Sequence, residues 1–193
     1  MIHGAFKFIS EKLNEHLKGR YNTPEDMVVV STMIQAQNGD MNEIQNKMVL
    51  SLINVERETT MGISAGYSRM SSDLVKKTRP PWHINLIFVA AAVFSEKQYL
   101  QSLKVLSCVL EFFQSQNVFS FSTSENTGNR EWRITVEPVN IDFQELTNLW
   151  SVLGGNYYPS MVGKIRMLTV DSEEIESLRR INKETQLDIL KDE

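Results

Sequence analysis

Apolar residues recur three or four positions apart in three segments of the chain, which is the spacing of one face of an α-helix. We therefore expect helices over residues 2–20, 96–114 and 142–153. The third segment starts with Asp142 and Glu145, whose spacing is that of a capping box. We expect the apolar stripe of the second helix to lie on a sheet. The stripes are Tyr99, Leu103, Leu106, Leu110 and Phe113 on the second helix, and Leu146, Leu149, Trp150 and Leu153 on the third.

Short runs rich in β-branched and aromatic residues lie between these helices and indicate strands. They cover residues 27–33, 47–58, 82–94, 131–137 and 161–170. The second and third runs are apolar on both faces near their centres, which is typical of strands inside a sheet. The pattern predicts an α+β fold, in which a four- to five-stranded, mostly antiparallel or mixed sheet packs against the helices.

Two stretches depart from this regular pattern. Residues 59–79 are polar and contain glycine and serine, so we expect a loop of about twenty residues, longer than a compact domain usually keeps. Residues 172–193 place Ile175, Leu178 and Ile181 at helical spacing among many charged residues. We expect a charged amphipathic helical tail there, and its packing on its own domain and its docking on a neighbouring copy both remain open.

Length and charge limit the classes of function. The 193 residues fit one domain with a substantial core, which we expect over residues 1–171. The net charge of -4 comes from residues 171–193, since the first 170 residues carry equal numbers of acidic and basic side chains. A neutral body does not favour binding to nucleic acid, which needs clustered lysine and arginine. Residues 57–79 are locally basic and are candidates for contact with an acidic surface. Their candidate contact residues are Arg69, Lys76, Lys77 and Arg79.

Membrane, redox and metal chemistry find little support in the sequence. No apolar run reaches the roughly 20 residues that span a bilayer, and the first residues lack the pattern of a signal peptide, so we expect a cytoplasmic protein without membrane insertion. Cys108 lies in an apolar helical stretch, which predicts a buried and unreactive thiol. His3, His16 and His83 are scattered without a second ligand at metal-binding spacing, so we expect no metal.

The pair Gly154 and Gly155 raises the question of a nucleotide-binding loop. In such a loop the strand comes first, and the glycines lead into a helix N-terminus that holds the phosphate. Here the glycines follow a predicted helix and precede Pro159 and a predicted strand. The order favours a structural joint formed by Gly154, Gly155 and Pro159, and we expect no cofactor.

The motif "GISAG" matches the G-x-S-x-G pattern of serine hydrolases, with Ser64 as the candidate nucleophile. A hydrolase needs an acid and then a histidine later in the chain, and His83 is the only histidine that follows. His83 begins a predicted central strand, and without a base a serine hydroxyl is a weak nucleophile. A glycine- and serine-containing loop explains the motif better, and a small serine hydrolase stays the alternative from another class of function.

Four stretches together resemble a known family. They are "FKFISEKLNEHL", "TRPPWHINLIFVAAAVF", "LKVLSCVLEFFQSQNVF" and "LTNLWSVLGGNYYPSMVGKIRM". In sequence and order they resemble the tail terminator or cap proteins of contractile injection systems, phage-tail-like particles such as the antifeeding prophage and the insecticidal virulence cassettes. The most specific part is "NLW..LGG.Y.PS...K.RM". Gly163 departs from the bulky, often aromatic residue that the resemblance leads us to expect, and the charged tail has no clear counterpart in the family.

The resemblance implies a structural protein without catalytic activity. It implies a homo-oligomeric ring, by analogy a hexamer, at the end of the inner tube and sheath distal to the baseplate, where it stops polymerisation and joins sheath to tube. A neck or tail-completion adaptor of the same kind of particle is the nearer alternative. We expect the subunit or sheath interface to involve the basic segment and the tail. Its candidates are Arg69, Lys76, Lys77, Arg79, Ile175, Leu178 and Ile181.

Overall fold

The computed structural model divides by its contacts into two compact units. The first consists of Met1–Glu56 and Ile84–Leu168, and the second of Arg57–His83 and Thr169–Glu193. The residues that the structure describes are 1–33, 44–59, 67–71, 74–78, 81–125, 128–170 and 175–180.

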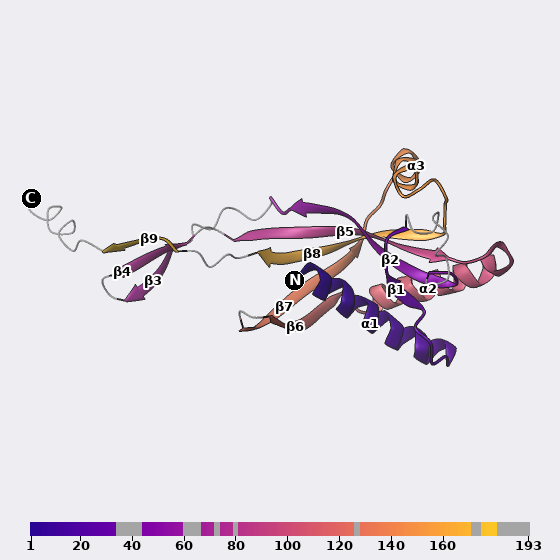
Figure 1. The fold of residues 1–193 in the computed structure, drawn as a ribbon, viewed down its shortest axis with the longest axis horizontal. Helices are drawn as coiled ribbons and strands as arrows, with labels where there is room; N and C mark the ends of the chain where they lie inside the picture. Colours follow the sequence, from indigo (N-terminus) through magenta and orange to yellow (C-terminus); the bar gives the residue numbers. More distant parts are fainter. Residues whose placement is uncertain are drawn as a thin grey trace, which may run out of the picture. The chain divides into compact units, whose positions relative to one another are not determined.

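A curled six-stranded sheet with three helices forms the first unit (Figure 1). The strand order is β1-β2-β5-β8-β7-β6, with β1 parallel to β2 and with β7 antiparallel to both of its neighbours, β6 and β8. The α+β class and the mixed sheet are therefore confirmed, and the sheet has one strand more than the upper number expected. The elements are α1 (Ile2–Tyr21), β1 (Val28–Val30), β2 (Lys47–Arg57), β5 (Trp82–Val93), η3 (Glu96–Gln98), α2 (Tyr99–Ser115), β6 (Val118–Glu125), β7 (Gly128–Pro138), α3 (Phe143–Val152) and β8 (Ser160–Val170).

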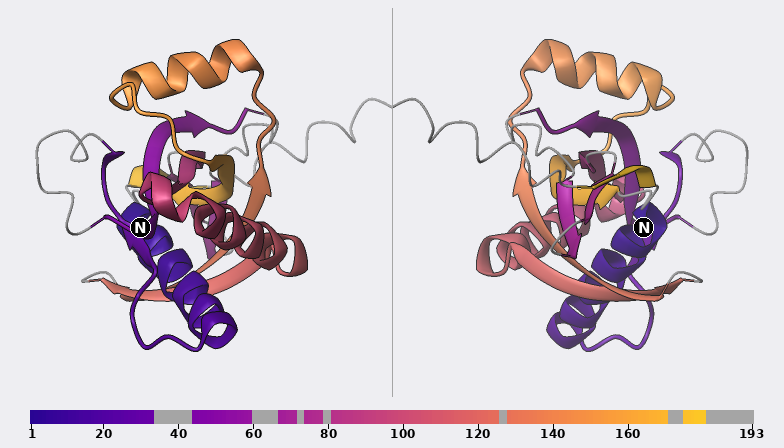
Figure 2. Two further views of the ribbon diagram at one scale, coloured as in Figure 1. Left: turned by 90° about the vertical axis from the view of Figure 1, so that its right-hand side faces the viewer. Right: turned by 90° about the vertical axis from the view of Figure 1, so that its left-hand side faces the viewer.

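Strand β5 is buried on both faces, because helices cover the sheet from both sides. Leu86 and Phe88 belong to the core cluster that contains the apolar faces of α1 and α2. Val89 and Ala91, which alternate with them, belong to a second cluster with Trp150 of α3. Figure 2 shows α3 on one side of the sheet and α1 on the other. Because successive side chains of a strand point to opposite faces of the sheet, β5 contributes to both hydrophobic clusters.

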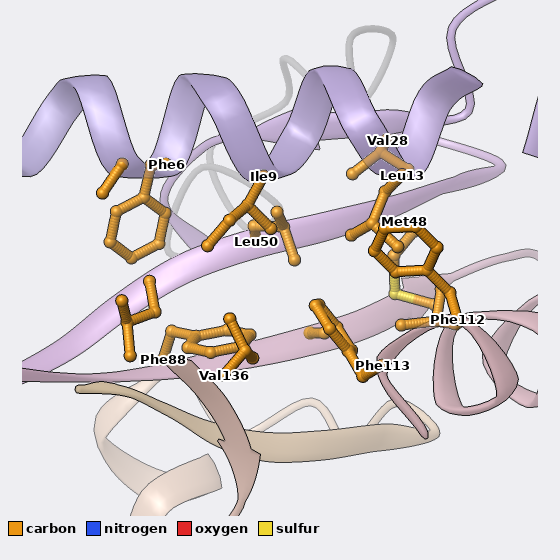
Figure 3. Close-up of a cluster of buried hydrophobic side chains, with 14 of the residues drawn as sticks. Phe6, Ile9, Leu13, Val28, Met48, Leu50, Phe88, Phe112, Phe113 and Val136 are labelled. Carbon is orange, nitrogen blue, oxygen red and sulfur yellow. The ribbon is translucent and has the colours of Figure 1, made fainter. Parts of the chain in front are cut away.

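The larger core lies between α1, α2 and the sheet. Figure 3 shows Phe6, Ile9 and Leu13 of α1 pointing toward Leu50 of β2 and Phe88 of β5. The rings of Phe6 and Phe88 meet edge to face, with centroids 6.2 Å apart. The predicted helix over residues 2–20 and the predicted inner strands are confirmed.

The predicted stripe of α2 is wrong. Tyr99, Leu103 and Leu110 are exposed, and of the five predicted residues only Phe113 is fully buried. Helix α2 has apolar residues on several sides, so more than one set of them has helical spacing. Packing against the sheet and α1 decides which of these faces is buried. The residues that are buried are Ser102, Val105, Cys108, Val109, Phe112 and Phe113. Cys108 is therefore buried, as predicted.

Strand β6 has no counterpart among the predicted strands. Its serines give it the composition of a loop, but Phe119 and Phe121 alternate with them and are buried. In the antiparallel pair with β7, Phe121 lies opposite Trp132. As an edge strand, β6 needs an apolar pattern on one face only.

Asn14 joins α1 to the edge strand β1. Its Oδ1 accepts hydrogen bonds from the backbone N–H groups of Met27 and Val28, both at 2.8 Å, and its Nδ2 donates to the carbonyl oxygen of Val28 at 2.9 Å. The side chain is buried, so these bonds replace the water that both partners lose. A polar residue on the inner face of α1 thus fixes where the edge of the sheet lies.

The second unit contains a three-stranded antiparallel sheet in the order β3-β4-β9. Its strands are β3 (Tyr67–Ser71), β4 (Leu74–Thr78) and β9 (Ile175–Arg180). The expectation of a loop throughout 59–79 is therefore wrong for β3 and β4, and the expectation of a helix is wrong for residues 175–180. Here the backbone groups of β9 pair with those of β4, about a hundred residues earlier in the chain. The periodicity of nearby residues does not detect such pairing. The rest of the predicted tail lies outside the described residues.

Candidate functional site

The structure brings the two predicted interface segments together within one chain. Arg69 lies on β3, and β4 pairs with β9 so that Lys76 is opposite Leu178 and Lys77 is opposite Ser177. Ile175 is opposite Thr78 at the end of this ladder. The C-terminal strand therefore pairs with the basic segment of its own chain. Arg79 and Ile181 lie outside the described residues.

The hydrolase motif also lies outside the described residues, Ser64 included. His83 lies near the start of β5, where its backbone carbonyl oxygen accepts a hydrogen bond from the N–H of Glu58 at 2.8 Å. Across the described parts of the chain, no three His, Cys, Asp or Glu side chains are grouped as metal ligands. No helix among the described segments has both the length and the apolar character needed to cross a membrane.

Gly154 and Gly155 close α3 and lead toward β8. Both have positive φ angles, 110° and 80°. The N–H of Gly155 donates to the carbonyl oxygen of Trp150 at 2.7 Å, which is the bond that closes a Schellman motif. The chain turns here through positive-φ conformations, which glycine adopts readily and residues with a side chain do not. The turn places the aromatic residues 157 and 158 beside the last turn of α3.

The start of α3 is fixed by the predicted capping box, which is confirmed. Asp142 Oδ1 accepts from the backbone N–H of Glu145 at 2.7 Å, and Glu145 Oε2 accepts from the backbone N–H of Asp142 at 2.9 Å. At the other end of the helix, Trp150 packs edge to face with Tyr157 and Tyr158, at centroid distances of 5.6 and 5.9 Å. Both ends of α3 are thus held by local contacts.

An apolar hollow, here called the α3 hollow, lies between α3 and the loop that follows it. Its volume is about 460 Å³. Phe143 and Tyr157, which both line it, are 83% and 61% exposed, although both side chains are large and aromatic. Large exposed apolar groups gathered around a hollow are characteristic of an interaction surface. The hollow is lined by Phe143, Leu146, Thr147, Trp150, Gly155 and Tyr157, together with Ser151.

A second hollow, here called the corner hollow, lies where β5 passes into η3 and α2. Its volume is about 470 Å³, and it shares Gly155 and Tyr157 with the α3 hollow. Glu96 is the charged residue in its lining, which contains no lysine or arginine. Besides Ala92, Ser95, Gly155, Asn156 and Pro159, it is lined by Phe94, Glu96, Tyr99, Ser102, Tyr157 and Tyr158.

Sequence reasoning missed the residues that form these hollows. Phe143, Glu96 and Tyr157 were not candidates, because nothing in the local pattern marks an exposed aromatic or a single carboxylate as part of a surface. One signal was available for Tyr157. It falls within the stretch that carries the most specific part of the resemblance to tail terminators, together with Trp150 and the two glycines.

Comparisons with known proteins relate this chain to a family model and to solved structures. The family model described as the Pvc16 N-terminal domain matches residues 6–184. The cryo-EM structure of the anti-feeding prophage cap, the AFP tube terminating cap, is similar with a TM-score of 0.54 and 12% sequence identity, over 90% of this chain and 58% of that chain. The PVC sheath/tube terminator in its extended state, from an extracellular contractile injection system, matches with a TM-score of 0.48 and 11% identity, over 88% of this chain and 59% of that chain. This chain therefore spans less than two thirds of either structure. No curated protein sequence matches it.

Proposed function

This chain belongs to the Pvc16 N-terminal domain family, and on that premise we propose that it is a structural tail terminator of a contractile injection system. In this role it caps the inner tube and the sheath, and its binding to the last layer of subunits stops polymerisation. The observation that carries the proposal is the family match over residues 6–184, which includes nearly the whole chain.

The fold supports this role. The six-stranded sheet with its three helices is similar to the AFP tube terminating cap over 90% of this chain. At 12% identity that likeness concerns the fold, so the assignment of the terminator role to this chain is our proposal. Since 58% of the cap is matched, the contacts made by the rest of that protein are not transferred to this chain.

The surface supports an assembly role better than an enzymatic one. The α3 hollow is lined mainly by apolar and aromatic residues, and α3 carries exposed Phe143 and Val152 at its two ends. Such a surface gains free energy when a partner protein covers it, because burial removes apolar area from water. We infer that the protein acts through contacts of this kind and not through catalysis.

We further propose that the protein forms a homo-oligomeric ring, a hexamer by analogy, that assembles in the cytoplasm and joins sheath to tube. A closed ring needs two different complementary patches on each subunit, and a stable interface buries upwards of roughly 1,000 Å². The α3 side offers one patch. The proposed second patch is the sheet of the second unit, whose strands contain Arg69, Lys76, Lys77, Ile175 and Leu178. Arg79 and Ile181 are proposed to extend this patch.

Purification of the full chain followed by light scattering and negative-stain microscopy tests the ring. The expected result is a particle of one defined mass and uniform diameter, formed at high concentration or upon addition of preformed inner tube. A protein that stays monomeric at high concentration and with tube present would exclude ring assembly. In labelled particles, a terminator lies at the extreme end, whereas a neck adaptor lies below a further ring.

A further inference from the structure

We propose that one face of the three-stranded sheet in the second unit, here called the cationic face, binds an acidic segment of a partner protein. Its basic positions are Arg69, Lys77 and Arg179. The inference rests on the proposed function in one respect, which is that this sheet is an assembly surface. It adds the face that makes the contact and the chemistry of the partner, and it brings in Arg179, which was not a candidate from the sequence.

The pairing of the strands places the three basic positions on one face. Val75 of β4 is opposite Arg69 of β3 on one side and opposite Arg179 of β9 on the other. Residues directly opposite each other in an antiparallel pair lie on the same face of the sheet, as do residues two apart along one strand. Lys77, two residues after Val75, therefore shares the face with both arginines. Neighbouring strands are about 4.8 Å apart, so the backbone positions of Arg69 and Arg179 are separated by roughly 10 Å.

Within the three described strands, no carboxylate holds a paired position on the cationic face. The positions opposite Lys77 are the neutral residues Tyr67 and Ser177. The one acidic residue of these strands, Glu176, falls between two paired rows, where the register shifts. Like charges gathered on one face repel one another, so carboxylates supplied by a partner relieve this repulsion when they bind.

The opposite face of the sheet holds its leucine and isoleucine positions. Lys76 is opposite Leu178, and Leu74 is opposite Arg180. Ile175 follows on the same face, in the row after the register shift. An antiparallel sheet commonly packs with one face and leaves the other to water, and the face with more apolar residues is the one that packs. This distribution makes the cationic face the one that favours a polar partner.

A protein segment with several carboxylates matches the cationic face. Arginine binds carboxylates through two parallel hydrogen bonds, so a face with two arginines and a lysine favours such a segment by both charge and geometry. Nucleic acid is a poorer match. It is a strong polyanion, and the net charge of -4 on this chain repels it at long range.

The chain's own residues 181–193 are the acidic segment nearest in sequence. They contain four acidic residues, but Lys183 and Lys191 lie among them. A segment of mixed charge is less complementary to a cationic face than a purely acidic one. Charge complementarity therefore favours a partner protein as the occupant.

The test uses the ¹⁵N-labelled full chain and two synthetic heptapeptides with acetylated and amidated ends. They are Ser-Asp-Ser-Asp-Ser-Asp-Ser and Ser-Asn-Ser-Asn-Ser-Asn-Ser, and the backbone amide signals of residues 69, 77 and 179 report binding. We expect the aspartate peptide to shift these signals saturably at low salt and to bind more weakly as salt is raised, because salt screens the attraction. The asparagine peptide should bind at least about tenfold more weakly. A short DNA duplex should also bind more weakly than the aspartate peptide.

The adjacent arginines of β9 offer a matched pair of variants. Arg179→Gln and Arg180→Gln remove the same charge from neighbouring positions on opposite faces. Arg179→Gln should weaken binding of the aspartate peptide about two- to fivefold, the range for one ion pair at a protein surface. Arg180→Gln should change it by less than about 1.5-fold. Arg69→Gln examines the same face from β3 and should act like Arg179→Gln.

Four results would each overturn the proposal. They are a full chain that does not bind the aspartate peptide at low salt, equal binding of the asparagine peptide, tighter binding of the DNA duplex, and an Arg180→Gln variant that weakens binding as much as Arg179→Gln. Ring formation is measured separately without peptide. Intact rings with failed peptide binding would therefore remove the acidic partner and leave the terminator role standing.

Discussion

The ring of Phe88 on β5 occupies the space next to the backbone of Gly163 on β8. A Cβ atom built on Gly163 would lie 2.5 Å from Phe88 Cζ and 2.6 Å from Cε1, closer than carbon atoms approach without bonding. Phe88 is fully buried and its ring meets Phe6 and Phe113, so it has no free space to move into. The aromatic bulk that the family resemblance leads us to expect at position 163 is thus supplied by the neighbouring strand.

Substitution Gly163→Ala should destabilise the protein by about 1–3 kcal/mol, because an added methyl group in a filled core forces off-rotamer side chains and backbone shifts. The measurement is the urea midpoint of unfolding. Gly19→Ala is the matched control, since nothing lies within 4 Å of the added methyl group, and it should gain about 0.5–1 kcal/mol as an alanine within a helix. An unchanged midpoint for Gly163→Ala would contradict the packing described here.

Substitution Asn14→Ala should cost about 3 kcal/mol of unfolding free energy. It removes three hydrogen bonds and leaves the buried backbone N–H and carbonyl of Val28 and the half-buried N–H of Met27 without their partner, at a cost in desolvation. The exposed variant Glu11→Ala on the same helix should stay within about 0.5 kcal/mol of the unmodified protein. Equal urea midpoints for the two variants would show that Asn14 does not hold β1.

Tyr21 should make stability depend on pH in alkaline solution. Burial, and after it the hydrogen bond with the Cys108 thiol at 3.5 Å, raises the pKa of Tyr21 from 10.0 to about 12. The fold favours the neutral phenol, so the stabilisation is complete below pH 10.0 and is lost as pH rises toward about 12. Unfolding free energies measured across this interval should fall more steeply for the unmodified protein than for Tyr21→Phe. Identical slopes would mean that Tyr21 ionises equally well in the folded and unfolded chain.

The exposed ends of α3 should matter for assembly and not for folding. The double variant Phe143→Ser and Val152→Ser removes two large, exposed apolar side chains, so its urea midpoint should change little. Incorporation into particles should fall at least about tenfold if these side chains are buried at an interface. Val30→Ser, which removes an exposed apolar side chain of the edge strand β1, is the control and should be incorporated normally. Normal incorporation of the double variant would remove α3 from the assembly surface.

Features with a local cause were predictable from the sequence. The capping of α3 follows from the spacing of Asp142 and Glu145, and the turn after it follows from the order in which helix, glycines and strand occur. Strand β5 is visible in the sequence as a nearly unbroken apolar run, because both of its faces are buried along most of its length, and its central place in the sheet was predicted correctly.

Features that depend on distant partners were not predictable. The buried face of α2 is selected by what it packs against, since Leu103 and Val105 are equally apolar and only one is buried. Strand β9 exists because β4 offers it a ladder of backbone partners, although Ile175 and Leu178 have helical spacing. The two hollows depend on how α3, the loop after it and the β5–η3 corner meet in space. Nothing in the sequence around Phe143 or Glu96 therefore identifies them as lining residues.

The length of the particle tests the central proposal most directly. Particles would be purified from cells that produce them with and without the gene for this chain, and the tubes and sheaths measured by electron microscopy. A terminator predicts a narrow length distribution in its presence and tubes or sheaths of uncontrolled length in its absence, with the narrow distribution restored when the gene is returned. An unchanged length distribution after deletion would contradict the account.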